Sequence, residues 1–342
     1  MTPRDVAIVA FARGYHHSTA GLSETEMLLP VLREALGQAG LAPGEADFTC
    51  SGSSDYLAGR PFSFTLTLDG VGAWPPIRES HVEMDGAWAL YEAWVKILTG
   101  QADTALVYAH AKPTSGAPHD VLTRQLDPYY LAPLWPDSVS LAALQAQALI
   151  DAGHTDEDRL ADLARRRHTT AGGQPHASDA YAVRPLRVRD CPTVTDGAAA
   201  VVLAAAGTAR RMCERPAWIR GIDHRIEAHA LGLRDLTDSP STRLAAEHAG
   251  AFDAPCDTAE LHAPFTAQEV VLRRALRLDD TVTVNPSGGA PAADPVMATG
   301  LIRLGEAAAR IHRGASDRAL AHATSGPCLQ HNLVAVLEGE GA

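Results

Sequence analysis

The chain has 342 residues, of which 46% are hydrophobic, so it can bury the core of two domains or of one large two-part fold. Its formal net charge of −12 disfavours a nucleic acid as a partner, because phosphate backbones attract basic proteins. No apolar run approaches the roughly 18 residues of a membrane span, and the N-terminus has only a short apolar run before a charge. We therefore expect a cytoplasmic protein without a membrane segment.

The five cysteines argue against a disulfide framework and against a zinc site. They are odd in number, and none lies in CxxC spacing. We therefore expect no bound metal, and we interpret most of the thiols as small buried hydrophobic groups: Cys50, Cys191, Cys213, Cys256 and Cys328.

Strands and amphipathic helices alternate along the first part of the chain. DVAIVAFA (residues 5–12) and TALVYAHA (104–111) are typical of buried strands, and SETEMLLPVLREALGQAG (23–40) is typical of an amphipathic helix that ends at glycine. Ser23 and Glu26 form the pattern of a capping box, in which a hydroxyl and a carboxylate satisfy unpaired backbone donors. The pattern predicts an α/β fold.

The second part of the chain repeats the first. AWIRGIDHR (217–225) matches the opening strand, and STRLAAEHAGAF matches the helix that follows it. ATGLIRLGEAAARIHRG (298–314) followed by DRALAHATSGP matches YEAWVKILTG followed by DTALVYAHAK. This duplication predicts two similar halves packed about a pseudo-twofold axis.

An insertion separates parts of the first half. Residues 113–192 are Pro-rich around LDPYYLAPLWPDS and helical in TDEDRLADLARRRH, and DGAAAVVLAAA (196–206) then reads as the last strand of the first half. We expect an N-terminal half, an inserted loop region and a C-terminal half, with these bounds: 1–112 and 193–212, 113–192, and 213–342.

Four stretches in this order resemble the thiolase superfamily, and within it the sterol-carrier-protein-type thiolases: RPLRVRDCPTVTDGAAAVVL, ELHAPFTAQEVVLRRAL, VNPSGGAPAADPVMATG and CLQHNLVAVLE. The resemblance covers nearly the whole chain. It implies the thiolase fold, with two βαβαβαββ halves in a layered α/β/α/β/α arrangement and an inserted loop region. That region is shorter here than is usual in the family, and a glycine-rich segment that normally follows the LQHN-like run is missing.

The resemblance also implies that the catalytic cysteine has been lost. In thiolases the segment matching VEMDGAWA carries the acyl-accepting cysteine at the position of Gly86, at a helix N-terminus where the dipole lowers a thiol pKa. Asp85 and Trp88 flank that position. The second thiolase cysteine matches Gly326, and Cys328 lies two places further on. Claisen chemistry needs an acyl-enzyme, so we do not expect a functional thiolase.

Two residues remain as catalytic candidates. His262 in ELHAPF stands where the sterol-carrier-type proteins have a histidine, and Asp294 stands at the place of the histidine in the family's GHP motif. Retro-aldol cleavage of a β-hydroxyacyl-CoA needs a base and donors for the thioester enolate, but no covalent intermediate. We expect Asp294 to be the base and His262 to be an enolate donor; a hydrogen bond at a strand end and Asp-Pro turn chemistry are the structural alternatives.

The remaining candidates are substrate contacts around the expected thioester site. The glycines of NPSGGA either let the backbone approach a thioester or only form a tight turn. Likewise, the LQHN histidine either contacts substrate or satisfies buried backbone groups, and the cysteine before it is either a proton carrier or an inert thiol. The predicted substrate-binding set is Asp85, Gly86, Trp88, Ser287, Gly288, Gly289, Gly326, Cys328 and His331.

Two classes of function stay open. The thiolase-like aldolases of steroid side-chain degradation resemble this chain in lacking the cysteine, and they work with an OB-fold partner. The chain is accordingly either a subunit of an acyl-CoA retro-aldolase complex acting on a β-hydroxyacyl-CoA, with a steroid side chain as the expected substrate, or a non-catalytic subunit that dimerises with an active paralogue. An acyltransferase is a distant third.

Both readings imply an assembly. We expect a homo- or heterodimer with a thiolase-like chain that buries part of residues 82–94, and an OB-fold protein as a further partner. Coenzyme A is expected only as part of the substrate thioester, and no other cofactor is expected.

Overall fold

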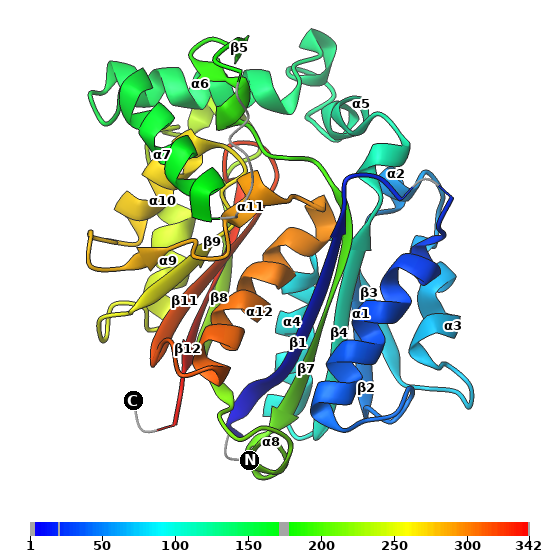
Figure 1. Ribbon diagram of the computed structural model, residues 1–342. Helices are drawn as coiled ribbons and strands as arrows, with labels where there is room; N and C mark the ends of the chain where they lie inside the picture. The colour runs from blue at the N-terminus through cyan, green and yellow to red at the C-terminus, as the bar shows by residue number, and fades with distance from the viewer. Residues whose placement is uncertain (1–3, 20, 171–177, 341–342) are drawn as a thin grey trace.

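The computed structural model describes residues 4–19, 21–170 and 178–340. Ten strands of the described residues form one continuous sheet that divides into two halves of five strands, and β5 and β6 form a separate two-stranded sheet. Figure 1 shows α4 and α12 between these halves and further helices on the outer faces. Apolar side chains from both halves meet around the two inner helices, and a separate apolar cluster lies under each outer layer. The predicted α/β/α/β/α layering is confirmed.

The N-terminal half of the sheet has the order β3-β2-β4-β7-β1. β2 is parallel to both β3 and β4, whereas β7 is antiparallel to β4 and to β1. The predicted strand at residues 104–111 coincides with β4. The bounds are β1 (Val6–His16), β2 (Phe48–Gly52), β3 (Glu79–Val82), β4 (Thr104–Ala111) and β7 (Asp196–Ala205).

The C-terminal half repeats this topology. Its order is β10-β9-β11-β12-β8, with the same succession of parallel and antiparallel pairs. The two halves join where β1 pairs with β8, at Ala7 with Trp218 and Ile8 with Ala217. The predicted duplication is therefore confirmed. The bounds are β8 (Ala217–Ile226), β9 (Thr258–Leu261), β10 (Thr283–Val284), β11 (Arg318–Ser325) and β12 (His331–Glu338).

The helices follow the same twofold plan. The predicted helix at residues 23–40 is α1, which begins at the capping box of Ser23 with Glu26 and ends at Gly40 in the left-handed conformation. α4 and α12 are the inner helices, and α1 lies on the opposite outer face from α9 and α10. The bounds are α1 (Glu24–Ala39), α2 (Asp55–Ala58), α3 (Leu68–Val71), α4 (Gly86–Leu98), α8 (Ala206–Met212), α9 (Pro240–His248), α10 (Thr266–Ala275), α11 (Gly289–Ala292) and α12 (Thr299–His312).

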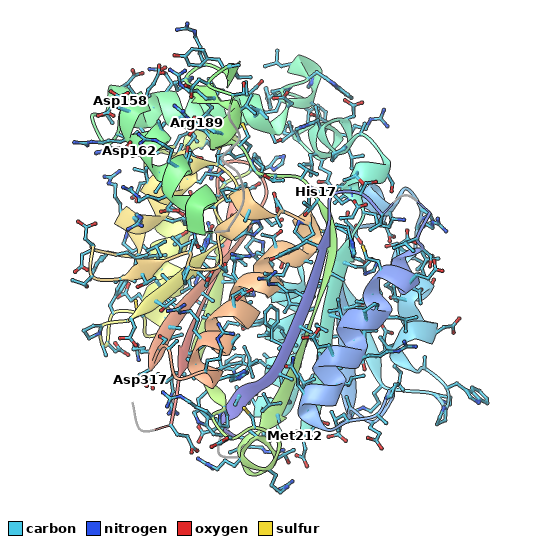
Figure 2. The ribbon with its side chains drawn as sticks, viewed as in Figure 1. His17, Asp158, Asp162, Arg189, Met212 and Asp317 are labelled. Atoms are coloured by element: carbon cyan, nitrogen blue, oxygen red, sulfur yellow. The ribbon has the colours of Figure 1, made fainter. Side chains whose placement is uncertain are left out.

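The segment between β4 and β7 forms a cap of helices over one end of the molecule (Figure 1). Apolar residues of its helices α6 and α7 share a cluster with α9 and α10. On its other side α7 carries Asp158 and Asp162, which are exposed (Figure 2). No helix of the described residues is long and apolar enough to cross a membrane. The bounds are α5 (Pro118–Arg124), α6 (Ser138–Asp151), α7 (Glu157–Thr170), β5 (Tyr181–Val183) and β6 (Leu186–Arg187).

A single carboxylate joins the two inner helices. Asp85 is the N-cap of α4 and accepts a hydrogen bond from the Ala87 N–H at 2.8 Å. The same carboxylate accepts from the N–H groups of Gly300, at 2.7 Å, and Leu301, at 3.0 Å, in the first turn of α12. Because the residue is only 1% exposed, these three donors replace water around the carboxylate.

Two glycines allow the inner helices to start so close to the sheet. A Cβ at Gly86, in α4, would lie 2.6 Å from the Cβ of Ala109, on β4. A Cβ at Gly300, in α12, would lie 2.6 Å from the Cβ of Ala323, on β11. The same glycine-on-alanine contact thus recurs in both halves, as a pseudo-twofold axis requires.

Removing the shared cap should destabilise the protein more than removing an ordinary one. Asp85→Ala leaves three buried N–H groups of two helices without an acceptor, so we expect a loss of about 2–4 kcal/mol in the free energy of unfolding. Asp137→Ala is the matched control, because Asp137 caps only α6, through the Ser140 N–H. It should cost about 1 kcal/mol. Urea unfolding measures both, and equal losses would contradict the shared role of Asp85.

Candidate active site

The structure brings the two predicted catalytic residues together. His262 directly follows β9, and its backbone N–H donates to the carbonyl of His322, on β11, at 3.1 Å. Its Nδ1 accepts from the Thr324 N–H at 3.4 Å, so the ring hydrogen lies on Nε2. Nε2 is 3.9 Å from Oδ1 of Asp294.

Asp294 is held by its backbone and by its side chain. It forms an isolated parallel bridge with Val194, in which its N–H donates to the Thr193 carbonyl at 2.9 Å. Its Oδ1 accepts from the hydroxyl of Thr299, the first residue of α12, at 2.6 Å. The carboxylate is therefore positioned at the start of an inner helix.

Burial tunes both groups for complementary roles. It raises the pKa of Asp294 to about 6, although the Thr299 hydroxyl and the Arg303 guanidinium oppose that shift. It lowers the pKa of His262 well below its usual value, and the nearby His322 and Arg303 add to that effect. At neutral pH the pair is a carboxylate beside a neutral imidazole.

A buried polar network supports the strand behind His262. Nε2 of His322 lies 3.0 Å from Oδ1 of Asn332, on β12. The amide nitrogen of Asn332 donates to the Ser241 hydroxyl at 2.7 Å and to the Leu329 carbonyl at 2.8 Å. His322 is not among the predicted site residues, although a histidine inside an otherwise apolar strand is a signal for it.

A second network occupies Ser287, one of the predicted substrate contacts. Its hydroxyl donates to Glu260 at 2.7 Å and accepts from Arg303 at 2.6 Å, and the two charged groups pair at 3.0 Å. The next residues, Gly288 and Gly289, have positive φ values of 96° and 67° and lead into α11. Their observed role is a tight turn, and a contact with substrate stays a prediction. Glu260 and Arg303 are not among the predicted site residues.

The position of the expected nucleophile is closed by packing. Besides touching Ala109, a side chain at Gly86 would come within 2.9 Å of Cδ2 of Leu301, on α12. The other two predicted contacts in this segment have structural partners. Asp85 caps both inner helices, and Nε1 of Trp88 donates to Nε2 of His331 at 3.2 Å.

His331 is held in an aromatic cluster. Nδ1 of His224 lies 3.2 Å from Nε2 of His331. The ring centroids of Trp88 and His224 lie 4.7 and 5.3 Å from the ring centroid of His331. Burial lowers the pKa of His331 to about 4, and the nearby His224 adds to that shift. Trp88 and His331, both predicted to contact substrate, therefore contact each other.

Cys328 and Gly326 lie in the turn between β11 and β12. The Cys328 thiol donates to the carbonyl of Leu141, on α6, at 3.4 Å, and burial raises its pKa to about 11. Gly326 has a positive φ of 76°, and a Cβ there would lie 2.8 Å from Oε1 of Gln330. The thiol thus faces the loop region as an un-ionised group.

The loop region is anchored next to β9 by a buried ion pair. Arg167, on α7, donates through Nε to Glu269, on α10, at 2.6 Å. Glu269 also accepts from Nδ2 of Asn285 at 3.2 Å, and Oδ1 of Asn285 accepts from the Leu261 N–H at 2.6 Å. The interaction chain ends one residue before His262.

Comparisons with known proteins find relatives along nearly the whole chain. No protein-family model matches the chain. The acetyl-CoA acetyltransferase of Methanothermobacter thermautotrophicus is 24% identical to it in an alignment that covers 96% of both proteins. The similarity to thiolase-superfamily proteins therefore extends over nearly the whole chain. The 17-hydroxy-3-oxo-4-pregnene-20-carboxyl-CoA lyase of Mycobacterium tuberculosis is 25% identical over 64% of the chain and 62% of the lyase.

Solved structures show the same fold over the whole chain. The Ltp2-ChsH2(DUF35) aldolase superposes with a TM-score of 0.78 and 17% identity, covering 100% of this chain and 99% of that one. Human mitochondrial 3-ketoacyl-CoA thiolase superposes with a TM-score of 0.77 and 16% identity, covering 100% of both chains. The thiolase fold is therefore established for this protein.

Restoring a thiol at position 86 should not restore thiolase chemistry. The natural protein has no thiol at position 86, so we expect it neither to form an acyl-enzyme nor to cleave acetoacetyl-CoA with free coenzyme A. Gly86→Cys should fail in the same way, because its side chain would overlap Ala109 and Leu301. Overpacking should also cost Gly86→Cys about 1–3 kcal/mol in the free energy of unfolding. Mass spectrometry of the protein after incubation with acetoacetyl-CoA detects adducts, and urea unfolding measures the loss.

Gly37→Cys serves as the matched control, since a Cβ at that helical glycine meets no atom within 4 Å. It should unfold at nearly the same urea concentration as the natural protein. A thioester adduct on Cys328 or on any other cysteine would contradict the absence of covalent catalysis.

Proposed function

We propose that this protein is a thiolase-like subunit of an acyl-CoA retro-aldolase complex, which cleaves a β-hydroxyacyl-CoA without a covalent intermediate. The observation that carries the proposal is the pairing of His262 with Asp294 at 3.9 Å, combined with the closed position at Gly86. The likeness to an aldolase and to a steroid-carboxyl-CoA lyase supports carbon–carbon bond cleavage, with a steroid side chain as the acyl group.

The proposed cleavage uses Asp294 as the base. Its carboxylate takes the proton of the β-hydroxyl, and the oxygen electron pair becomes the new carbonyl bond as the Cα–Cβ bond breaks. The electrons of that bond move into the thioester enolate, whose oxygen accepts the Nε2–H of His262. Protonation of the enolate carbon by the Asp294 carboxyl then gives a shortened acyl-CoA and a ketone or aldehyde. Coenzyme A enters only with the substrate, and the proposal needs no further cofactor.

We also propose that the subunit acts within a dimer and with a further partner. β3 is the last strand of its half of the described sheet, so its outer edge can pair with a second thiolase-like chain. The adjoining helix α4 carries the half-buried Tyr91 and Trp94, within the segment 82–94 expected at the interface. The name of the Ltp2-ChsH2(DUF35) aldolase joins two components, which supports a heteromer; an OB-fold protein is the partner that we propose.

A specific observation favours a second candidate function. The side chains of His262 and Asp294 are only 7% and 8% exposed, so a substrate would have to reach a nearly closed site. A non-catalytic subunit that completes the pocket of an active paralogue would keep such a closed pair for stability alone. Substitution of the pair separates the two functions.

Both members of the pair should be needed for turnover if this subunit is catalytic. Removing a positioned general base costs about 10²–10⁴-fold in rate, so Asp294→Asn and His262→Ala should each lower retro-aldol turnover within that range. Turnover is measured as release of the ketone or aldehyde from a steroidal β-hydroxyacyl-CoA by the assembled complex, after its mass has been checked. Asp137→Asn and His119→Ala are controls outside the pair. Near-natural rates for both pair variants would assign this chain the non-catalytic role.

The proposed base also predicts a pH dependence. Because the pKa of Asp294 is raised to about 6, its carboxyl accepts no proton below that pH, and kcat/KM should fall about tenfold for each pH unit under 6. Because burial lowers the pKa of His262 well below its usual value, protonation of that imidazole does not account for a fall in activity that begins at pH 6. The profile is measured between pH 4.5 and 8 on the assembled complex. If the residual activity of Asp294→Asn shows the same acid limb, Asp294 is not the base.

A further inference from the structure

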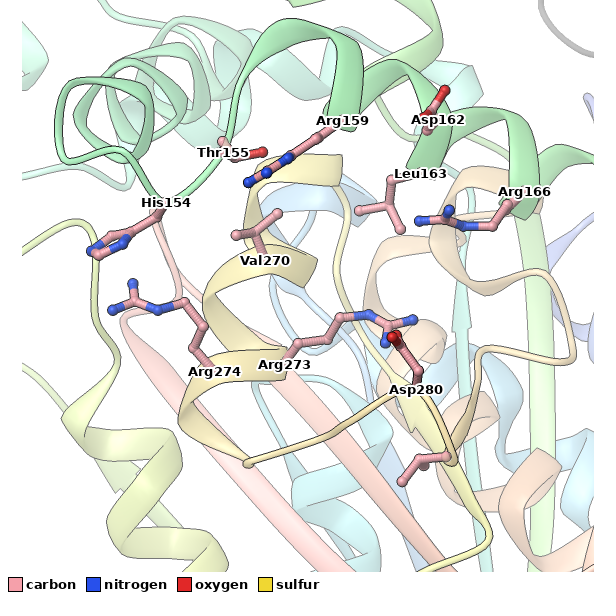
Figure 3. Close-up of a pocket in the computed structure, with 11 residues that line it drawn as sticks. His154, Thr155, Arg159, Asp162, Leu163, Arg166, Val270, Arg273, Arg274 and Asp280 are labelled. Carbon is pink, nitrogen blue, oxygen red and sulfur yellow. The ribbon is translucent and has the colours of Figure 1, made fainter.

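A basic cavity lies between the loop region and the outer layer of the C-terminal half. Its volume is about 540 Å³, which suits a ligand of nucleotide size. Figure 3 shows Arg159 and Arg166 extending from α7 on one side and Arg273 and Arg274 from α10 on the other. Neither His262 nor Asp294 lines it, so the cavity is distinct from the catalytic pair.

The cavity concentrates positive charge in an acidic protein. Its lining contains four arginines against two aspartates, Asp162 and Asp280, whereas the chain as a whole has a formal net charge of −12. Guanidinium groups are weakly hydrated forks of N–H donors that match the oxygen pairs of phosphates. An excess of such groups around one cavity attracts an anion with two or more charges.

The arginines of α10 are positioned before any ligand arrives. Nε of Arg273 donates to Glu269 at 2.8 Å, and one terminal nitrogen of Arg274 donates to the Thr237 carbonyl at 2.9 Å. A guanidinium has five N–H donors, so each bond uses only part of the fork. Glu269 is itself buried and paired with Arg167, which makes the wall that carries Arg273 rigid. Such preorganisation lowers the entropy cost of binding.

The remaining walls suit the uncharged part of such a ligand. Leu163 of α7, Val270 of α10 and Val282 contribute apolar surface next to the arginines. We infer that this cavity binds a small molecule carrying a diphosphate or several phosphates, with its organic portion against the apolar side chains. The inference does not depend on the retro-aldol reaction proposed above.

Titration calorimetry on the full chain tests the inference with three probes: inorganic pyrophosphate, ADP and coenzyme A. The loss of one charge-assisted contact weakens binding about tenfold or more. Arg159→Glu should therefore raise the Kd of the probes at least about tenfold. Arg33→Glu is the matched control, because it makes the same change of charge at an exposed residue of α1, on the opposite outer face, and does not line the cavity. It should change the affinity by less than about twofold. Asp280→Asn removes a negative charge from the lining and should tighten binding, a gain that misfolding cannot imitate.

The probes separate the possible sources of the phosphates. Binding of pyrophosphate and ADP, weakened by Arg159→Glu, supports a site for phosphorylated ligands in general. Binding of coenzyme A alone, weakened in the same way, supports the inference and assigns the site to the phosphates of that molecule. Binding of none of the three, or binding that Arg159→Glu leaves unchanged, overturns it.

Discussion

The Asp85 carboxylate accepts N–H groups from both inner helices, and the alignment of the two halves depends on it. The helix starts would otherwise present unpaired donors and two positive dipole ends to each other inside the core. Burial raises the pKa of this carboxyl to about 7, and the three backbone donors oppose the shift. The helices can approach because Gly86 and Gly300 lack side chains where each meets an alanine of the sheet. Charge and close packing therefore act at one point, between the two halves.

The chemistry of the site follows from the same helix starts. The first residue of α12, Thr299, donates to Asp294, while Leu301 of the same turn fills the space where a thiolase nucleophile would project. The helix start that positions the proposed base thus also excludes a covalent nucleophile. A thiolate at position 86 would moreover adjoin the buried Asp85 carboxylate, and a neighbouring negative charge raises a thiol pKa. Packing at Gly86 and the charge of the neighbouring Asp85 therefore both disfavour a thiolate nucleophile at this place.

Much of the fold could be predicted because its signals are local. The capping box at Ser23 and the apolar run that became β4 depend on neighbouring residues, and the duplication repeats such signals in order. The proximity of His262 and Asp294 followed from family resemblance rather than from any local pattern. The role of Asp85 could not be predicted, because its donors lie in the other half of the chain. Ser287 was predicted to contact substrate, but in the structure it binds Glu260 and Arg303. These partners could not be predicted, because they are distant from Ser287 in sequence and come close to it only once the strands are paired.

A duplicated fold offers two pseudo-equivalent places for an active site, and packing explains why this chain can use only one of them. In the N-terminal half Ser51 of β2 pairs with Tyr108 of β4, and at the equivalent place in the C-terminal half Leu261 of β9 pairs with His322 of β11. The residues that follow, Gly52 and His262, are therefore equivalent. A Cβ at Gly52 would lie 2.6 Å from the backbone of Gly86, because the start of α4 closes over the end of β2. No side chain can project there, whereas the end of β9 carries an imidazole beside a carboxylate. The asymmetry between the halves thus arises from backbone approach in one and buried polar groups in the other.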